Sequence, residues 1–525
     1  MGSVLVVKSA CVSPVIGALV ALCVLESAVA QVSDDVLVVG QTAEPASLDP
    51  GVTTATNDAR ILVNLYDGLV RYRPGSLEVE PALAESWTVS EDGRRYSFRL
   101  RESVRFHDGS ALDAAAVKFT FERLLDPAHP AAQTGPFPLA FLFRMVERVE
   151  AVDARTVRFV LREPFAPFLA NLAGPTGLVV SPKAVMEEGR AFGRRPVGTG
   201  PFRFVEWQSS RKVTLARNPD YWDGTAASRL VIFRPLSDPN TRATEMLAGG
   251  VDLMTEMPPD ALALFRNREG FAVHEQVGPH LWYLILNMQA GPLRDRRVRQ
   301  AVNYAIDRRA IATHVLQGTA VPARGITAPV FALADDPDLP GYPYDPERAR
   351  RLLREAGAEG ARLSFLVTEG GSGMLDPVAM GTAIQADLAA VGLDARISTY
   401  EWNAYLARVN RGLGEADMAE MAWITNDPDQ LPSLALRSDA RPGQGGFNAG
   451  GYANPGLDRL LEEARRTTEP GRRRDLYRAV ERIVAEDAPF AVVVHGKQGA
   501  VTTAAVRGFS LEPSFSLRLV GVSKR

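Results

Sequence analysis

The sequence predicts an α/β protein, because segments typical of strands alternate with segments typical of helices along the chain. Residues 36–39 form a short aliphatic run that fits a buried strand. Residues 96–100 and 156–161 alternate apolar and polar side chains, as half-buried strands do. Helix-like spacing of apolar residues covers 58–69 and 114–125. This alternation favours sheets covered by helices over an all-helical or all-strand protein.

Later helices are marked by their ends as well as by their apolar spacing. Asp345-Pro346 supplies a cap and a first-turn proline, and Gly357 ends that helix. Asn454-Pro455 begins another helix in the same way, and an apolar stripe over 476–484 indicates a third. We interpret these stripes as faces that pack into the core.

The length of 525 residues predicts two to four domains. No boundary has the composition of a flexible linker, so we expect interleaved domains with the chain crossing between them more than once. Residues 282–287 and 490–495 are apolar, strand-like runs and are the candidate crossings.

The first 30 residues have the pattern of a secretory signal peptide. Lys8 precedes an apolar stretch over residues 12–25, and Ala28-Val29-Ala30 supplies small residues before a cleavage site. The alternatives are a membrane anchor and a lipoprotein that uses Cys23. Cys11 and Cys23 are the two cysteines. Cleavage after Ala30 therefore leaves a mature chain without disulfides, thiolate metal ligands or a cysteine nucleophile.

Charge and motifs exclude several classes of function. The net charge is −3 with no long basic run, which argues against a surface for nucleic acid or anionic membranes. The six histidines form no H-E-x-x-H pair. The glycine-rich stretch 370–374 ends in Met374, so it lacks the last glycine of a nucleophile elbow, and it lacks the Gly-Lys-Ser/Thr of a phosphate loop. We predict no catalytic residue, cofactor or metal, and therefore no enzyme.

A series of short phrases, in order from about Leu37 to the C-terminus, resembles the family 5 extracellular solute-binding proteins, which include dipeptide-, oligopeptide-, glutathione- and nickel-binding members. Each phrase alone is weak, but their order and spacing are specific. The phrases are Glu44-Pro45, Leu48-Asp49-Pro50, Leu65-Tyr66-Asp67-Gly68-Leu69, Pro81-Ala82-Leu83-Ala84-Glu85-Ser86-Trp87, Phe106-His107-Asp108-Gly109, Val197-Gly198-Thr199-Gly200-Pro201-Phe202, Arg217-Asn218-Pro219-Asp220-Tyr221-Trp222, Pro292-Leu293, Arg297-Val298-Arg299-Gln300-Ala301 and Ala305-Ile306-Asp307-Arg308.

The resemblance implies a two-lobe, periplasmic-binding-protein-like α/β fold that closes on its ligand. The first lobe is expected over 31–281 and 495–525, with an extra subdomain over about 76–190, and the second lobe over 282–494. The implied function is the substrate-binding component of an ABC importer, a monomer in the periplasm of a Gram-negative envelope. Its implied partners are a small-molecule or peptide ligand and the membrane permease subunits, with no nucleic acid.

The resemblance also places the ligand site. Peptide-binding members carry an Asp three residues after a Trp, which pairs with the peptide amino group. Here Asn426 stands three residues after Trp423, and Asp427 follows one place later. The expected ligand-binding residues lie in a first-lobe loop (Thr42 and Glu44) and in the second lobe (Glu369, Gly371, Ser372, Tyr400, Trp402, Trp423, Asn426, Asp427, Phe447 and Asn448).

The same resemblance leaves the ligand open. Dipeptide binders carry an Arg for the peptide carboxylate, and that position falls near Gly371, where residues 368–373 contain no basic side chain. A zwitterionic dipeptide is therefore less favoured. Glu369 points to a cationic or hydroxyl-rich ligand, and oligopeptides held by their backbone remain open. The alternative functions are a secreted α/β hydrolase and a ligand-binding sensor that is not coupled to import.

Overall fold

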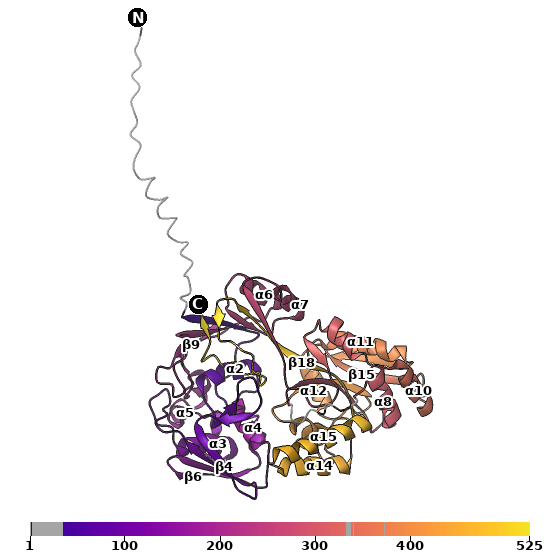
Figure 1. The fold of residues 1–525 in the computed structure, drawn as a ribbon, viewed down its shortest axis with the longest axis horizontal. Helices are drawn as coiled ribbons and strands as arrows, with labels where there is room; N and C mark the ends of the chain where they lie inside the picture. The colour runs from indigo at the N-terminus through magenta and orange to yellow at the C-terminus, as the bar shows by residue number, and fades with distance from the viewer. Residues whose placement is uncertain (1, 3–34, 332–335, 337, 340, 372) are drawn as a thin grey trace.

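The computed structural model describes residues 2, 35–331, 336, 338–339, 341–371 and 373–525. Apart from Gly2, the predicted signal peptide lies outside these residues. Within them, none of the helices combines the length and the apolar character needed to cross a bilayer. Figure 1 shows two lobes side by side, with the C-terminus returning to the lobe that holds the first described strands.

A twelve-stranded sheet runs through both lobes in the order β16-β15-β17-β13-β18-β11-β1-β10-β9-β8, with β12 and β14 also paired to β18. Parallel pairing joins β1 to β10 and β15 to β16, and the other strand pairs are mostly antiparallel. The strands are β1 (Val36–Gln41), β8 (Phe202–Gln208), β9 (Lys212–Arg217), β10 (Leu230–Pro235), β11 (Leu253–Thr255), β12 (Phe271–Val277), β13 (His280–Leu286), β14 (Ala320–Pro322), β15 (Arg362–Thr368), β16 (Asp394–Tyr400), β17 (Met418–Ile424) and β18 (Phe490–Thr503).

The long strand β18 belongs to both lobes. Its first part, 490–494, pairs with β13 in the second lobe, and its last part, 500–502, pairs with β11 in the first lobe. Strand β12 runs along 497–503 of β18 and leads into β13 after Gly278 and Pro279. The expected crossing run 490–495 forms the first part of β18, which bridges the lobes in Figure 1, whereas the run 282–287 lies in β13, just after the chain enters the second lobe at 278–279. The proposed domain boundaries themselves stay a prediction.

Helices cover the sheet on both sides, and several begin and end where the sequence indicates. The Asp345 side chain accepts a hydrogen bond from the Arg348 amide, and Gly357 is left-handed with φ +64°. The helices are α2 (Thr56–Leu65), α3 (Ala114–Leu125), α4 (Phe168–Ala173), α5 (Pro182–Glu188), α6 (Pro239–Leu247), α7 (Pro259–Phe265), α8 (Arg296–Ala305), α9 (Arg308–Ala310), α10 (Pro346–Ala356), α11 (Pro377–Ala390), α12 (Trp402–Val409), α13 (Gln430–Ala435), α14 (Pro455–Arg466) and α15 (Pro470–Asp487).

Helix α2 differs from the prediction of a helix over 58–69. It ends at Leu65, because Tyr66 is extended (φ −132°, ψ 160°). That turn buries the carboxylate of Asp67 among three donors from distant segments, namely Thr199, Tyr221 and Trp222. The local spacing of apolar residues cannot predict such long-range hydrogen bonds, which keep the residues after Leu65 out of the helix.

The second lobe has core on both faces of its sheet. Strand β13 is buried along its whole length. Trp282, Leu284 and Leu286 pack into one apolar cluster, and the alternate residues Leu281, Tyr283 and Ile285 pack into another. A strand with two buried faces appears in the sequence as a continuous apolar run, which explains the pattern at 282–287.

The first lobe carries a separate four-stranded sheet in the order β4-β5-β7-β6. The strands are β4 (Ala84–Val89), β5 (Arg95–Leu100), β7 (Thr156–Leu161) and β6 (Val146–Asp153), with a small pair β2 (Val70–Tyr72) and β3 (Val79–Pro81) beside them. Its core is aromatic, and Phe121 meets Phe143 and Phe159 edge to face at 5.2 and 4.9 Å. A final two-stranded pair, β19 (Val506–Arg507) and β20 (Ser523–Lys524), ends the chain.

Candidate functional site

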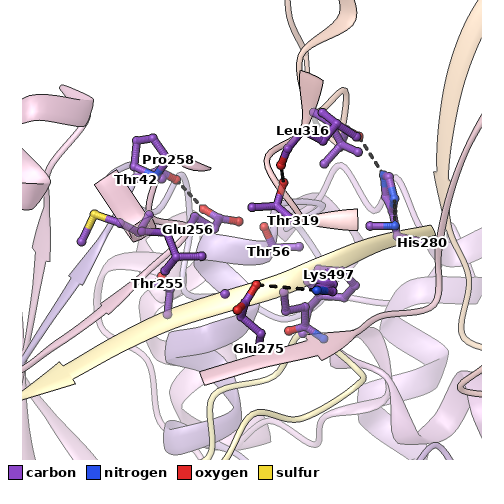
Figure 2. Close-up of a pocket in the computed structure, with 18 of the residues that line it drawn as sticks. Thr42, Thr56, Thr255, Glu256, Pro258, Glu275, His280, Leu316, Thr319 and Lys497 are labelled. Carbon is purple, nitrogen blue, oxygen red and sulfur yellow. Dashed lines mark hydrogen bonds and ion pairs between the residues drawn. The ribbon is translucent and has the colours of Figure 1, made fainter. Parts of the chain in front are cut away.

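A cavity of about 750 Å³ lies where the two lobes meet. This volume is in the range of small-molecule sites. The first-lobe wall includes Thr42, Thr56, Arg60, Arg242 and Glu256; the strands β12 and β18 contribute Glu275 and residues 496–499; the second-lobe wall includes Val315, Leu316, Thr319, Gly371, Gly373, Met374, Leu375, Asp376 and Ile424. Figure 2 shows these walls facing one another across β18. The wall therefore combines segments that are far apart in the sequence.

An ion pair stands in the first-lobe wall. Arg60 on α2 places Nη2 3.0 Å from Oε1 of Glu256. The Thr42 hydroxyl donates to Oε2 of Glu256 at 2.9 Å, as Figure 2 shows. Burial raises the pKa of Glu256, but the charge and hydrogen bonds of Arg60 and the hydrogen bond of Thr42 outweigh burial and lower it. Glu256 is therefore ionised and its two oxygens already have protein donors.

The backbone of the wall is held in uncommon conformations. Glu256, Gln317 and Phe515 line the cavity with φ of +55°, +48° and +62°, although none of them is glycine. Each such residue costs on the order of 1–3 kcal/mol, and such conformations cluster at binding and switch regions. Here they lie in both lobes around one cavity.

The strands that connect the lobes carry their own charges. Lys497 on β18 donates to the carbonyl of Gly318 in the second lobe at 2.7 Å, and its Nζ lies 3.9 Å from Oε1 of Glu275 (Figure 2). Glu275 also pairs with Arg266 at 3.1 Å. Lys497 therefore ties the shared strand to the second lobe at the cavity edge.

His280 lies at the base of the second-lobe wall as a neutral ring. Burial lowers its pKa to about 4. Its Nδ1 accepts a hydrogen bond from the Gly496 amide at 3.2 Å, so Nε2 carries the proton and donates to the Gly373 carbonyl at 2.7 Å. His280 thereby holds the glycine-rich loop against β13.

The structure brings two of the predicted site residues to this cavity. Thr42 and Gly371 line it. Ser372 lies outside the described residues. The other nine do not line this cavity in the described structure. For example, the carboxylate of Glu44 accepts hydrogen bonds from the Trp207 indole at 2.7 Å and from the Ser210 amide at 2.9 Å. Glu369 is exposed beside the glycine-rich loop.

The aromatic residues predicted for the site contact other side chains of the second lobe. Trp402 stacks on Tyr405 with ring centroids 6.1 Å apart, and Tyr400 lies under the guanidinium of Arg408 at 5.6 Å. Trp423 meets Phe447 edge to face at 5.2 Å. Phe447 is 38% exposed, so this pair offers an apolar surface on the second lobe. Their role as ligand contacts stays a prediction.

The polar residues predicted around 426–448 have internal partners in this conformation. Asp427 is buried and forms an ion pair with Arg473 on α15. It lines a small cavity of about 60 Å³ together with Phe165 and Asn171 of the first lobe. The side chain of Asn448 donates to the carbonyls of Arg437 and Tyr452. Asn426 faces Gly174 of the first lobe.

Sequence reasoning did not find the charged residues of the cavity, namely Arg60, Arg242, Glu256, Glu275, Asp376 and Lys497. None belongs to a motif, and they come from separate helices and strands. The available signals were Asp238-Pro239, which marks the start of the helix that carries Arg242, and Asp376-Pro377, which marks the start of α11. Among the described residues, no cluster of three or more His, Cys, Asp or Glu side chains is placed to hold a metal ion.

Comparison with known proteins identifies the family. The family model for bacterial extracellular solute-binding proteins, family 5 Middle, matches residues 78–444. This chain belongs to the family 5 extracellular solute-binding proteins. It is 33% identical over 506 residues to di/tripeptide-binding protein 2 of Pseudomonas aeruginosa (strain UCBPP-PA14), which covers 93% of this chain and 94% of that protein.

Solved structures of the family have the same fold. HbpA2 from Haemophilus parasuis matches with a TM-score of 0.86 at 28% identity, over 93% of this chain and all of that one (100%). The ABC transporter-associated periplasmic binding protein DppA from Helicobacter pylori, in complex with the peptide STSA, matches with a TM-score of 0.76 at 29% identity, over 93% and 98% of the two chains.

Membership of family 5 confirms the predicted fold class, two α/β lobes with an added subdomain. It also confirms that the chain is a solute-binding protein of the ABC transporter type and not an enzyme, because family 5 proteins bind their solutes without catalysis. The alternative of a secreted hydrolase is therefore excluded by the family.

Proposed function

We propose that this family 5 protein captures a di- or tripeptide, or a related small solute, in the cavity between its lobes. The observation that carries the proposal is that both lobes and the strands joining them contribute to one cavity of about 750 Å³. A solute held there contacts both lobes at once. It therefore binds more tightly to the closed arrangement of the lobes and shifts the protein toward it.

The peptide class rests on similarity over nearly the whole chain. The di/tripeptide-binding relative covers 93% of this chain, and the matching DppA structure holds a peptide. The cavity supports this class, because it combines apolar walls from residues such as Leu262, Met374 and Leu375 with the polar side chains of Arg242 and Asp376. Peptides offer both kinds of contact.

The proposed partners are the membrane subunits of an ABC importer, and the proposed location is the periplasm of a Gram-negative envelope. The N-terminal pattern ending at Ala30 supports export, and the family is extracellular. We propose that one monomer, with lobes over 31–281 plus 495–525 and over 282–494, presents its closed form to the permease.

Thermal unfolding of the purified mature chain tests the proposal. We expect di- and tripeptides to raise the melting temperature, because a ligand at 100 times its Kd adds about 2.7 kcal/mol to the stability of the folded state. Amino acids, sugars and opines serve as the comparison set. A panel in which no peptide raises the melting temperature contradicts the peptide class.

Uptake by cells separates import from sensing. Deleting the gene is expected to abolish uptake of the peptide that binds the purified protein, and restoring the gene is expected to recover it. Unchanged uptake, together with tight binding in vitro, would instead favour a sensor that is not coupled to import.

A further inference from the structure

One arginine in the cavity wall has no carboxylate partner. Arg242 on α6 lines the cavity and is only 7% exposed. Its Nη1 donates to the carbonyls of Leu236 and Ser237 at 3.3 and 3.2 Å. Its Nε is buried without a hydrogen-bond partner, and no acceptor for Nη2 is found among the described residues. One edge of the guanidinium is therefore unused by the protein.

Other buried arginines show that this arrangement is unusual in the described chain. Arg123 also has a buried Nε without a hydrogen-bond partner, but it pairs with Asp49, whereas the buried Arg299 and Arg308 form no ion pair within the described residues and donate through Nε to backbone carbonyls. The two other cations of the cavity are engaged, since Arg60 pairs with Glu256 and Lys497 is bound to Gly318. Arg242 forms no ion pair within the described residues.

The physical chemistry of this arginine points to an anionic ligand. Burial lowers the pKa of Arg242, and the nearby carboxylates of Glu256 and Asp238 raise it. Glu256 is close enough to affect this pKa but forms no hydrogen bond or ion pair with Arg242 among the described residues; its oxygens bind Arg60 and Thr42. A guanidinium stays charged in proteins, and a buried charge without a partner is unfavourable. Nη2 is not among the buried atoms and has no protein acceptor in the described part of the chain, so it is the donor that a ligand carboxylate can reach, in a charge-assisted hydrogen bond.

We infer that Arg242 binds the carboxylate of the solute, for a peptide its C-terminal carboxylate, through Nη2. The inference rests on the proposed function and adds a specificity-determining residue to it. The carboxylate anchor then lies on the first lobe. The second-lobe position near Gly371 has no basic residue and is covered by Trp402, so the first lobe supplies the cation that the second lobe lacks.

Pairs of peptides that differ in this one group test the inference. Isothermal titration would compare Ala-Ala, Leu-Leu and Ala-Ala-Ala with their C-terminal amides. The wild type is expected to bind the free acids about 30-fold or more tightly than the amides, the loss typical of removing one partner of a buried charge pair. Arg242→Gln should lose this preference, and Arg242→Lys should keep part of it, because a lysine retains the charge without the planar fork.

The control variant is Arg234→Gln on β10, close in sequence to α6. Arg234 pairs with Glu245 at 2.8 Å and does not line the cavity, so this variant should keep the preference for acids.

Two results would overturn the role of Arg242 and leave the peptide-binding function standing. The wild type could bind acids and amides with equal affinity, or Arg242→Gln could keep the preference for acids. If Lys497→Gln loses the preference for free acids over amides and Arg242→Gln keeps it, the carboxylate is bound by Lys497 and not by Arg242. If the wild type binds none of these peptides, both proposals fall.

Discussion

The indole of Trp402 covers Gly371. A Cβ added to Gly371 would lie 2.4 Å from Cε3 of the Trp402 ring, and Gly371 has a φ of +148°, which side chains rarely allow. Both constraints require glycine at this position. They give a physical reason why the second lobe carries no arginine where the resemblance to dipeptide binders places one.

Gly371→Ala is expected to lower the stability of the protein by about 1–3 kcal/mol, because the methyl group overlaps the indole and the backbone is strained. The matched control is Gly370→Ala, since a Cβ at Gly370 meets nothing within 4 Å. Guanidinium unfolding midpoints of the two variants measure the difference. Equal unfolding midpoints for the two variants would show that the contact with Trp402 does not require glycine at position 371.

Glu420 on β17 makes the stability depend on pH. It is fully buried, Oε1 accepts a hydrogen bond from the Thr368 amide at 2.7 Å, and Oε2 has no partner. Burial raises its pKa from 4.5 to about 9. The folded state therefore keeps a proton that the unfolded chain releases between pH 4.5 and 9. The stabilising contribution of this proton is fully present below pH 4.5 and is lost as the pH rises toward 9.

Glu420→Gln should remove this dependence, because the amide stays neutral and its oxygen can still accept from Thr368. We expect the variant to exceed the wild type in stability at pH 8 by on the order of 2–4 kcal/mol, with a smaller difference at pH 5. Unfolding midpoints at the two pH values measure the effect. Glu359→Gln, at an exposed position, is the control. If the unfolding midpoints of variant and wild type differ by the same amount at both pH values, the result would contradict a Glu420 that is neutral in the folded state.

The pair between Asp427 and Arg473 predicts a structural cost for changing either residue. Asp427→Asn leaves the buried Arg473 guanidinium without its counter-ion, so we expect a loss of about 3–5 kcal/mol in stability. Asp439→Asn is the matched control, because Asp439 pairs with Arg437 while its side chain is 72% exposed. That change should cost about 1 kcal/mol or less. If Asp427→Asn instead leaves stability unchanged and abolishes peptide binding, Asp427 is the amine-binding residue that the resemblance implies.

Much of the fold could be predicted from local patterns. The cap at Asp345, the left-handed Gly357 and the alternating strand at 156–161 are properties of neighbouring residues, and the structure has each of them. Strand β13 was visible as a continuous apolar run because it is buried on both faces. The end of α2 could not be predicted from local patterns, because Asp67 is held by hydrogen-bond donors more than a hundred residues away in the sequence.

The cavity was harder to predict than the fold. Arg60 and Glu256 are 196 residues apart in the chain, and Asp427 and Arg473 are 46 apart. No periodicity or motif relates such residues, so their pairing depends on the relative placement of helices and strands. The resemblance supplied candidates, of which Thr42 and Gly371 line the cavity. It could not show that Arg242 is left without a counter-ion.

Protection of a single cysteine would test the central claim that the solute binds in the cavity between the lobes. The predicted mature chain has no cysteine, so one thiol can be placed at will. Leu375 lines the cavity and is 39% exposed, whereas Val378, three residues further along, is 44% exposed and does not line it. A saturating di- or tripeptide is expected to slow maleimide labelling of Leu375→Cys at least several-fold and to leave labelling of Val378→Cys unchanged. Equal labelling rates with and without peptide at both positions, for a peptide that binds, would contradict the account.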